Sequence, residues 1–142
     1  MKNLAKHKVA VRTREYIVQA IFQLLFNNES VDSIIKQFED EHFGKKVDFV
    51  NFIKVLSVIN KRKDVFSSIL NSDLGLKDSE MELIDKSILF YGIYELENKE
   101  LPKEIAIDEC IRLSRKFSSP DSYKFINAYL DKLSKLNIIL DK

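Results

Sequence analysis

The sequence predicts an all-α fold of about seven helices. Apolar residues recur at spacings of three and four along most of the chain, which is typical of amphipathic helices. Only three Gly and two Pro occur in 142 residues, too few for the turns of hairpins, barrels and glycine-rich phosphate loops. A hydrophobic content of 45%, including 11% aromatic residues, is enough to bury a core without disulfides or metal.

The first two helices follow from their apolar stripes. Residues 16–25 place apolar side chains on one helical face, and the pair Asn27-Asn28 ends that helix. A shorter amphipathic helix is expected around residues 34–38, with Asp32 and Ser33 as candidate N-caps, ending near Phe43-Gly44.

Two more helices complete the first half of the chain. Residues 49–59 keep helical spacing, and Asp48 suits the positive first turn of their helix. The basic triplet Lys61-Arg62-Lys63 marks the change to a short helix that carries apolar residues between 65 and 70.

A long central helix is expected from residue 79 to about residue 98. Ser79-Glu80-Met81-Glu82 matches the S-x-x-E capping box, which satisfies two backbone donors at a helix start. The apolar residues that follow cover more than one stripe, so neighbours must surround this helix. Gly92 inside it costs about 1 kcal/mol relative to Ala, which predicts close crossing by another helix.

The last two helices both begin with a proline signal. Pro102 suits the first position of a helix whose buried stripe runs from 106 to 117, because its missing N–H would have no partner there. Ser118-Ser119-Pro120-Asp121 repeats the signal, with serine as cap and an acid in the first turn. The final stripe runs from 125 to 136.

Composition limits the function classes. The net charge of +1 means that nucleic-acid binding requires a local basic patch. A single Cys110, no signal-peptide pattern and no apolar run approaching the roughly 20 residues of a membrane span predict a reduced, cytoplasmic protein without a membrane partner.

No chemistry of catalysis is recognisable. His7 and His42 lack partners at metal-ligand spacing, and Cys110 lies on a predicted buried face. No phosphate-loop, dinucleotide or nucleophile-elbow motif occurs, and the paired acids fit helix caps and solvated faces. We therefore expect no metal, no cofactor and no enzymatic activity.

Basic residues gather at the amino terminus. If the first helix reaches back to Lys8, then Lys8 and Arg12 lie one turn apart, and Gln19 lies within about 40° of them on the helical wheel. Such a row could track phosphates, with Arg forming bidentate contacts and the amide reading base edges. Ordinary solvation is the alternative for such a charge run.

Aromatic residues stand beside a lysine near the start of the last helix. Phe117, Tyr123 and Phe125 with Lys124 suit stacking on unpaired bases, although helical spacing also fits a core role for the two phenylalanines. Two other basic groups occur, at residues 61–63 and between residues 112 and 116. We interpret both as mainly structural, because positive charge is stabilised at the carboxyl ends of helices.

Three stretches in order resemble the NusB family of bacterial transcription antitermination factors. Residues 12–22 resemble its arginine-rich opening and first helix, residues 88–117 its central segment with Tyr-Glu-Leu, Pro and Ile-Ala-Ile-Asp-Glu, and residues 121–132 its Lys-Phe-Val-Asn signature. The resemblance implies one domain over residues 1–142, with helical subdomains of about 1–72 and 78–138.

The resemblance also implies a function in binding. Family members join NusE, a small-subunit ribosomal protein, and bind the single-stranded boxA element of nascent RNA. With other Nus factors on RNA polymerase, they suppress termination, notably in ribosomal RNA operons. By position, Asp85 and exposed neighbours match the NusE side. The predicted RNA-binding residues are Lys6, Lys8, Arg12, Arg14, Gln19, Phe22, Phe117, Asp121, Lys124 and Phe125.

The chain departs from the family pattern at several positions. Ala10 and Val11 stand where the family has arginines, and Lys6 and Lys8 are expected to substitute for them. Phe90 replaces a frequent arginine and Ala128 a glycine.

Two other functions stay open at this point. One is an accessory RNA-binding domain related to those of RNA methyltransferases, which would require a catalytic domain that this chain lacks. The other is a helical protein-interaction module without RNA binding. The sequence also leaves open whether the free protein forms a homodimer through its RNA surface.

Overall fold

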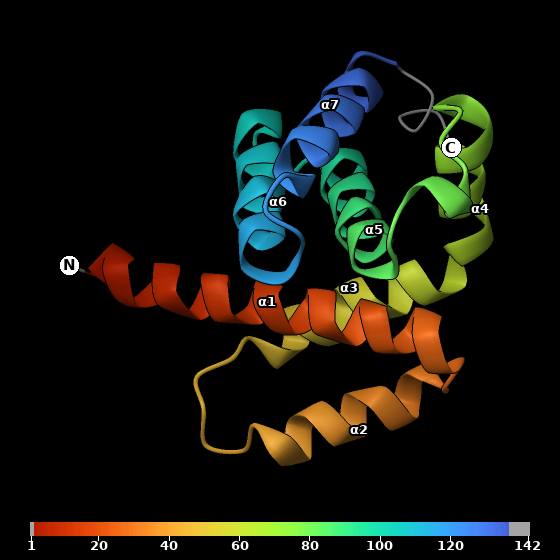
Figure 1. Ribbon diagram of the computed structural model, residues 1–142. Helices are drawn as coiled ribbons and strands as arrows, with labels where there is room; N and C mark the ends of the chain where they lie inside the picture. Colours follow the sequence, from red (N-terminus) through yellow and green to blue (C-terminus); the bar gives the residue numbers. More distant parts are fainter. Residues whose placement is uncertain (1, 137–142) are drawn as a thin grey trace. The chain divides into compact units, whose positions relative to one another are not determined.

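The computed structural model describes residues 2–136 and is all-α, as expected (Figure 1). Seven α-helices and no strand occur within that range. Residues 137 and 138, which the sequence assigns to the C-terminal subdomain, lie outside it. The chain divides into two compact units, Met1–Lys61 and Arg62–Lys142. None of the helices in the described part is both long and apolar enough to cross a membrane.

The first unit consists of α1 (Lys2–Asn27), α2 (Val31–Glu41) and α3 (Phe49–Lys61), each in contact with the other two. Their apolar stripes meet because residues three and four apart share a helix face. Ile17, Ile21 and Phe52 are fully buried at this centre, and the Phe38 ring lies 5.3 Å from that of Phe52.

The helix ends of this unit are capped by side chains. The hydroxyl of Ser30 accepts a hydrogen bond from the Ser33 amide (3.1 Å), so the prediction of Asp32 or Ser33 as the N-cap of α2 was wrong. The carboxylate of Asp48 accepts a hydrogen bond from the Asn51 amide (3.0 Å) at the start of α3.

The second unit is built around α5 (Leu83–Asn98), which contacts both α6 (Lys103–Phe117) and α7 (Ser122–Lys135). Every residue of α5 from Ser87 to Leu96 is buried, which confirms its central place in the unit. The unit opens with α4 (Lys63–Ser68), a π-helical turn (Ile69–Asp73) and a 3₁₀ turn (Asp78–Glu80).

Gly92 allows the close crossing that its sequence position predicted. A Cβ atom there would lie 2.7 Å and 2.9 Å from the two Cδ atoms of Leu130 on α7, and 3.2 Å from Sγ of Cys110 on α6. The absence of a side chain therefore lets both helices approach α5.

Two predicted helix starts were wrong. α5 begins at Leu83 and not at residue 79, because the Glu80 carboxylate instead accepts from the Lys77 amide (2.9 Å) in the 3₁₀ turn. α7 begins at Ser122, since the Ser122 amide donates to the Ser119 carbonyl (3.0 Å) in a turn that contains Pro120. Pro102 directly precedes α6, one residue from its expected place.

Candidate functional site

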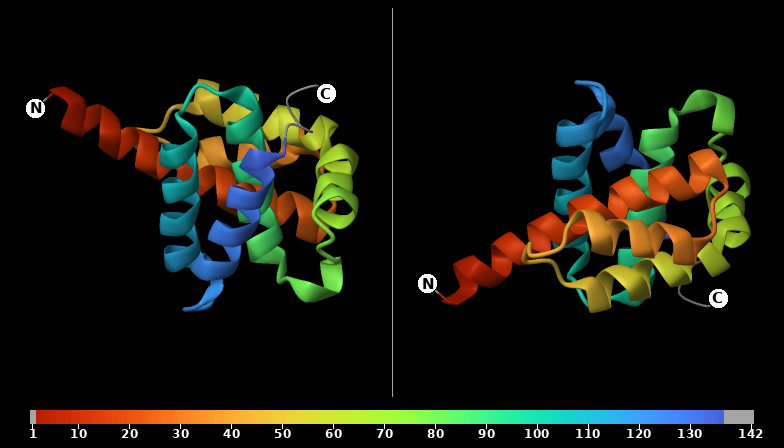
Figure 2. Two further views of the ribbon diagram at one scale, coloured as in Figure 1. Left: turned by 90° about the horizontal axis from the view of Figure 1, so that it is seen from above. Right: turned by 90° about the horizontal axis from the view of Figure 1, so that it is seen from below.

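The amino-terminal basic residues lie on one continuous helix. Because α1 begins at Lys2, the condition for placing Lys8 and Arg12 one turn apart is met. Lys6, Lys8 and Arg12 are exposed, whereas Arg14 is half-buried. Figure 2 shows the amino-terminal end of α1 extending beyond α2 and α3. Cationic side chains can therefore approach a polyanion from this end of the first unit.

Arg12 is held by the loop between α2 and α3. Its Nη1 atom donates a hydrogen bond to the main-chain carbonyl of Lys46 (3.2 Å). A guanidinium has five N–H donors, so this contact orients the group and leaves donors for a phosphate.

Farther along α1, Gln19 is exposed and Phe22 is half-buried. The Phe22 ring stacks on that of Phe26, with centroids 5.8 Å apart and planes 14° apart, and Phe26 is 68% exposed. Phe26 was not among the RNA-binding residues predicted from the sequence. Its position four residues after Phe22 was a signal for the stacking of the two rings.

A second group of predicted residues surrounds the turn between α6 and α7. Phe117 and Phe125 are half-buried. Their exposure is therefore intermediate between that of a core residue and that of a ring fully available to stack on a base. Lys124 Nζ lies 4.0 Å from the carboxylate of Asp121, and both side chains are largely exposed. These residues belong to the second unit, whereas the basic row of α1 belongs to the first.

The structure adds a cation–π pair to this second group. The guanidinium of Arg115 lies 4.4 Å from the ring centroid of Tyr123. Such a contact requires the end of α6 and the first turn of α7 to face each other, so spacing within one helix could not reveal it.

Asp85 is not on an exposed face, which corrects that expectation. It is 6% exposed, and its Oδ1 accepts a hydrogen bond from the Ser118 hydroxyl (2.5 Å). The reason is its place on α5: Asp85 precedes buried Ile88 and Leu89 by three and four residues and therefore shares their face.

One shallow groove of about 450 Å³ collects residues that the sequence assigned to different ligands. Asp85, matched to the protein partner, lines it together with Asp121 and Phe125, matched to RNA. Glu80 and Glu82 bring the number of carboxylates in its lining to four, and the remaining lining residues are Ser79, Met81, Ser119 and Ser122.

Most other basic and polar candidates have structural partners. Arg62 pairs with Glu97 and lies 5.2 Å from the ring centroid of Phe66. Arg112 Nε donates to the Glu109 carboxylate (3.1 Å). Among the described residues, no cluster of three or more His, Cys, Asp or Glu side chains could hold a metal ion.

The departures from the family pattern also have places in the structure. Phe90 is fully buried, with its ring edge-on to that of Phe66 at 5.6 Å, so this position belongs to the core here. Ala128 is exposed on α7.

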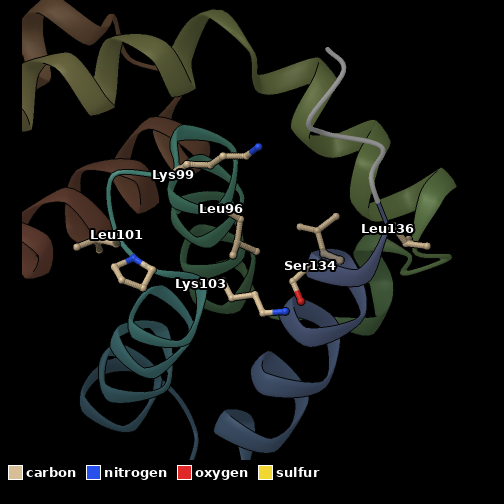
Figure 3. Close-up of a pocket in the computed structure, with 8 residues that line it drawn as sticks. Leu96, Lys99, Leu101, Lys103, Ser134 and Leu136 are labelled. Carbon is tan, nitrogen blue, oxygen red and sulfur yellow. The ribbon is translucent and has the colours of Figure 1, made fainter.

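A separate apolar pocket of about 300 Å³ lies where α5, α6 and α7 approach one another (Figure 3). Four leucines line it, and the lysines Lys99 and Lys103 are also part of the lining. No predicted site residue lines this pocket.

Comparison with known proteins gives one consistent result. The NusB family model matches residues 11–135. The transcription antitermination protein NusB of Psychromonas ingrahamii is 32% identical over 122 residues, covering 85% of this chain and 84% of the relative. The protein of the same name from Coxiella burnetii strain RSA 493 is 31% identical over 129 residues, covering 90% and 94%.

Structural comparison agrees on the fold. A crystal form of T. maritima NusB superposes with a TM-score of 0.77, covering 93% of this chain and 96% of that one, at 23% sequence identity.

Proposed function

The chain belongs to the NusB family of transcription antitermination proteins, and we propose that it performs this function by binding boxA RNA of nascent transcripts together with NusE. Its mechanism is binding and not catalysis. Together with other Nus factors on RNA polymerase, the complex suppresses termination in the cytoplasm, notably in ribosomal RNA operons.

The observation that carries the RNA part of this proposal is the exposed row of Lys8, Arg12 and Gln19 on α1. Two cations one helical turn apart suit successive phosphates of a single strand, and an amide beside them can read a base edge. Lys6 is also exposed but lies on another face of α1 than Lys8, so it adds positive charge near the amino terminus without lengthening the row. Ala10 and Val11, between Lys8 and Arg12, provide no charge.

The aromatic residues Phe117 and Phe125, with Lys124, supply a second RNA contact in this proposal. Half-buried rings are anchored by the unit and keep one part free, which suits stacking on unpaired bases. Lys124 is largely exposed and adds a cation beside them.

The acidic groove, which Phe125 borders on one side, favours a different ligand. Four carboxylates in its lining repel phosphates and attract the basic side chains of a protein partner. We therefore assign the groove to NusE. The exposed Glu80, Glu82 and Asp121 make the contact, and the buried Asp85 in the lining acts through its hydrogen bond with Ser118.

Fluorescence anisotropy of labelled boxA-like RNA, with and without NusE and across a salt series, tests this function. We expect tighter binding with NusE, and a logarithm of affinity that falls with the logarithm of salt by about 0.7 per phosphate neutralised. RNA binding that is absent with and without NusE would overturn the proposal. NusE binding alone would then favour a protein-interaction module.

A further inference from the structure

We propose that the loop between α2 and α3, residues 42–48, is an additional contact element for single-stranded RNA. In it Phe43 stacks on an unpaired base, and Lys45 and Lys46 contact phosphates beside Arg12. This inference rests on the proposed RNA-binding function and extends it to residues that neither sequence pattern nor family resemblance indicated.

The loop is fixed to the basic part of α1 at three points. The His42 ring stacks on Tyr16, with centroids 3.9 Å apart and planes 19° apart. At the other end the Asp48 amide donates to the hydroxyl of buried Thr13 (3.0 Å). Between them Arg12 donates to the carbonyl of Lys46, so the loop lies along the turn of α1 that carries Arg12.

Phe43 lies in the turn with which this loop begins. The Lys45 amide donates to the His42 carbonyl (3.1 Å), which closes a turn with Phe43 and Gly44 at its centre. Gly44 has φ +84°, a left-handed conformation that favours glycine. The Phe43 side chain is 90% exposed, so nearly its whole ring is available to a base.

The charges of the loop suit a polyanion. Lys45 and Lys46 are exposed beside α1, which has Ala10 and Val11 just before Arg12. The carboxylate of Asp48 is engaged by the Asn51 amide (3.0 Å). Three acidic residues end α2 ahead of the loop: Asp40 is paired with Lys36 (3.4 Å), and Glu39 and Glu41 are exposed. The loop itself carries Lys45 and Lys46 after Gly44. The loop thus offers an exposed ring followed by two cations, the combination found in single-strand binding surfaces.

A tryptophan substitution provides a direct probe because the chain contains no Trp. In F43W the only indole should be quenched by boxA-like RNA as a base stacks on it, with affinity preserved. In V50W, at another exposed site (82%) at the start of α3, the same RNA should leave the fluorescence unchanged.

Affinity measurements on truncated variants complete the test. F43A should bind the RNA about 5- to 150-fold more weakly, the range measured for loss of one base stack, whereas V50A should bind like wild type. K45A/K46A should reduce the salt slope by about 0.7 for each phosphate that is no longer neutralised. Circular dichroism confirms that the variants keep their helices.

The outcomes separate this inference from the proposed function. If wild type binds RNA and R12A weakens it, but F43A and K45A/K46A bind normally, the loop assignment is wrong and the proposed function stands. If wild type binds no RNA with or without NusE, both fail. If F43A no longer binds NusE but binds RNA as wild type does, the loop is a protein contact and the inference is overturned.

Discussion

The Ser118 hydroxyl donates a 2.5 Å hydrogen bond to Oδ1 of Asp85, joining the turn after α6 to the first turn of α5. Asp85 is 6% exposed, so its carboxylate depends on such a donor. The bond also holds the segment that leads into α7. There lie Asp121, which we assign to NusE, and Lys124 and Phe125, which we assign to RNA.

Loss of this donor should destabilise the protein. We expect S118A to lower the free energy of unfolding by about 1–3 kcal/mol, because a buried carboxylate loses a hydrogen bond. Urea unfolding measures the effect, and S119A, which alters an exposed neighbour, should behave like wild type. Equal stability of S118A and S119A would show that the bond contributes nothing.

The exposed row on α1 gives a prediction about RNA. R12A should weaken binding of boxA-like RNA and reduce the salt slope by about 0.7, because one phosphate fewer is neutralised. Arg12 is exposed, so the helical content should stay the same. K132A, which removes an exposed lysine from α7 in the second unit, serves as the control. An affinity and slope matching those of K132A would remove Arg12 from the RNA site.

Gly92 gives a prediction about packing. G92A should destabilise the protein by roughly 1–3 kcal/mol through overpacking, against a gain of about 1 kcal/mol in helix propensity. The new Cβ would meet the two Cδ atoms of Leu130. In an L130V background those atoms are gone, so the cost of G92A should largely disappear. A double-mutant cycle from urea unfolding measures this coupling, and simple additivity would contradict it.

Helices could be predicted from the sequence because spacing of apolar residues is a local property. Their starts were harder, since several polar residues compete to cap one turn. Ser79-Glu80-Met81-Glu82 fits a capping box, yet Glu80 pairs with the Lys77 amide and ends a short 3₁₀ turn. Whether the capped turn starts at Lys77 or at Ser79 depends on how the rest of the protein holds the preceding chain. The four residues of the motif carry no information about that.

The candidate sites show the same limit. The row of Lys8, Arg12 and Gln19 followed from spacing on one helix. The buried face of Asp85 could have been recognised in the same way, from its spacing to Ile88 and Leu89. Its hydrogen bond could not, because the donor Ser118 lies 33 residues away in the chain. The loop around Phe43 was read only as the end of a helix, because nothing in its sequence indicates that Arg12 and Thr13 hold it.

Asp78 gives a prediction about pH. A hydrogen bond from Asn71 (3.2 Å) lowers the pKa of its carboxyl, nearby Lys86 lowers it further, and partial burial opposes both. The stabilisation is therefore present above the ordinary aspartate pKa of about 3.9 and is lost as pH falls through the folded-state pKa.

The variant D78N tests that assignment. At pH 7 it should be less stable than wild type by no more than about 1 kcal/mol, because the Asp78 side chain is 62% exposed. The difference should narrow in urea unfolding curves below about pH 4, where wild type also loses its charge. A difference that stays constant with pH would rule out the carboxylate as its source.

Thr13 gives a prediction about the anchor of the α2–α3 loop. Its hydroxyl donates to the Val9 carbonyl (2.7 Å) and accepts from the Asp48 amide (3.0 Å), and the residue is 1% exposed. T13V keeps the shape of the side chain but leaves the Asp48 amide without this acceptor, at a cost of about 1–3 kcal/mol. T13S keeps the hydroxyl and is the matched control for the hydrogen bond. Amide hydrogen exchange at Asp48 should accelerate in T13V and not in T13S. Equal exchange in the two variants would mean that Thr13 does not hold the loop beside Arg12.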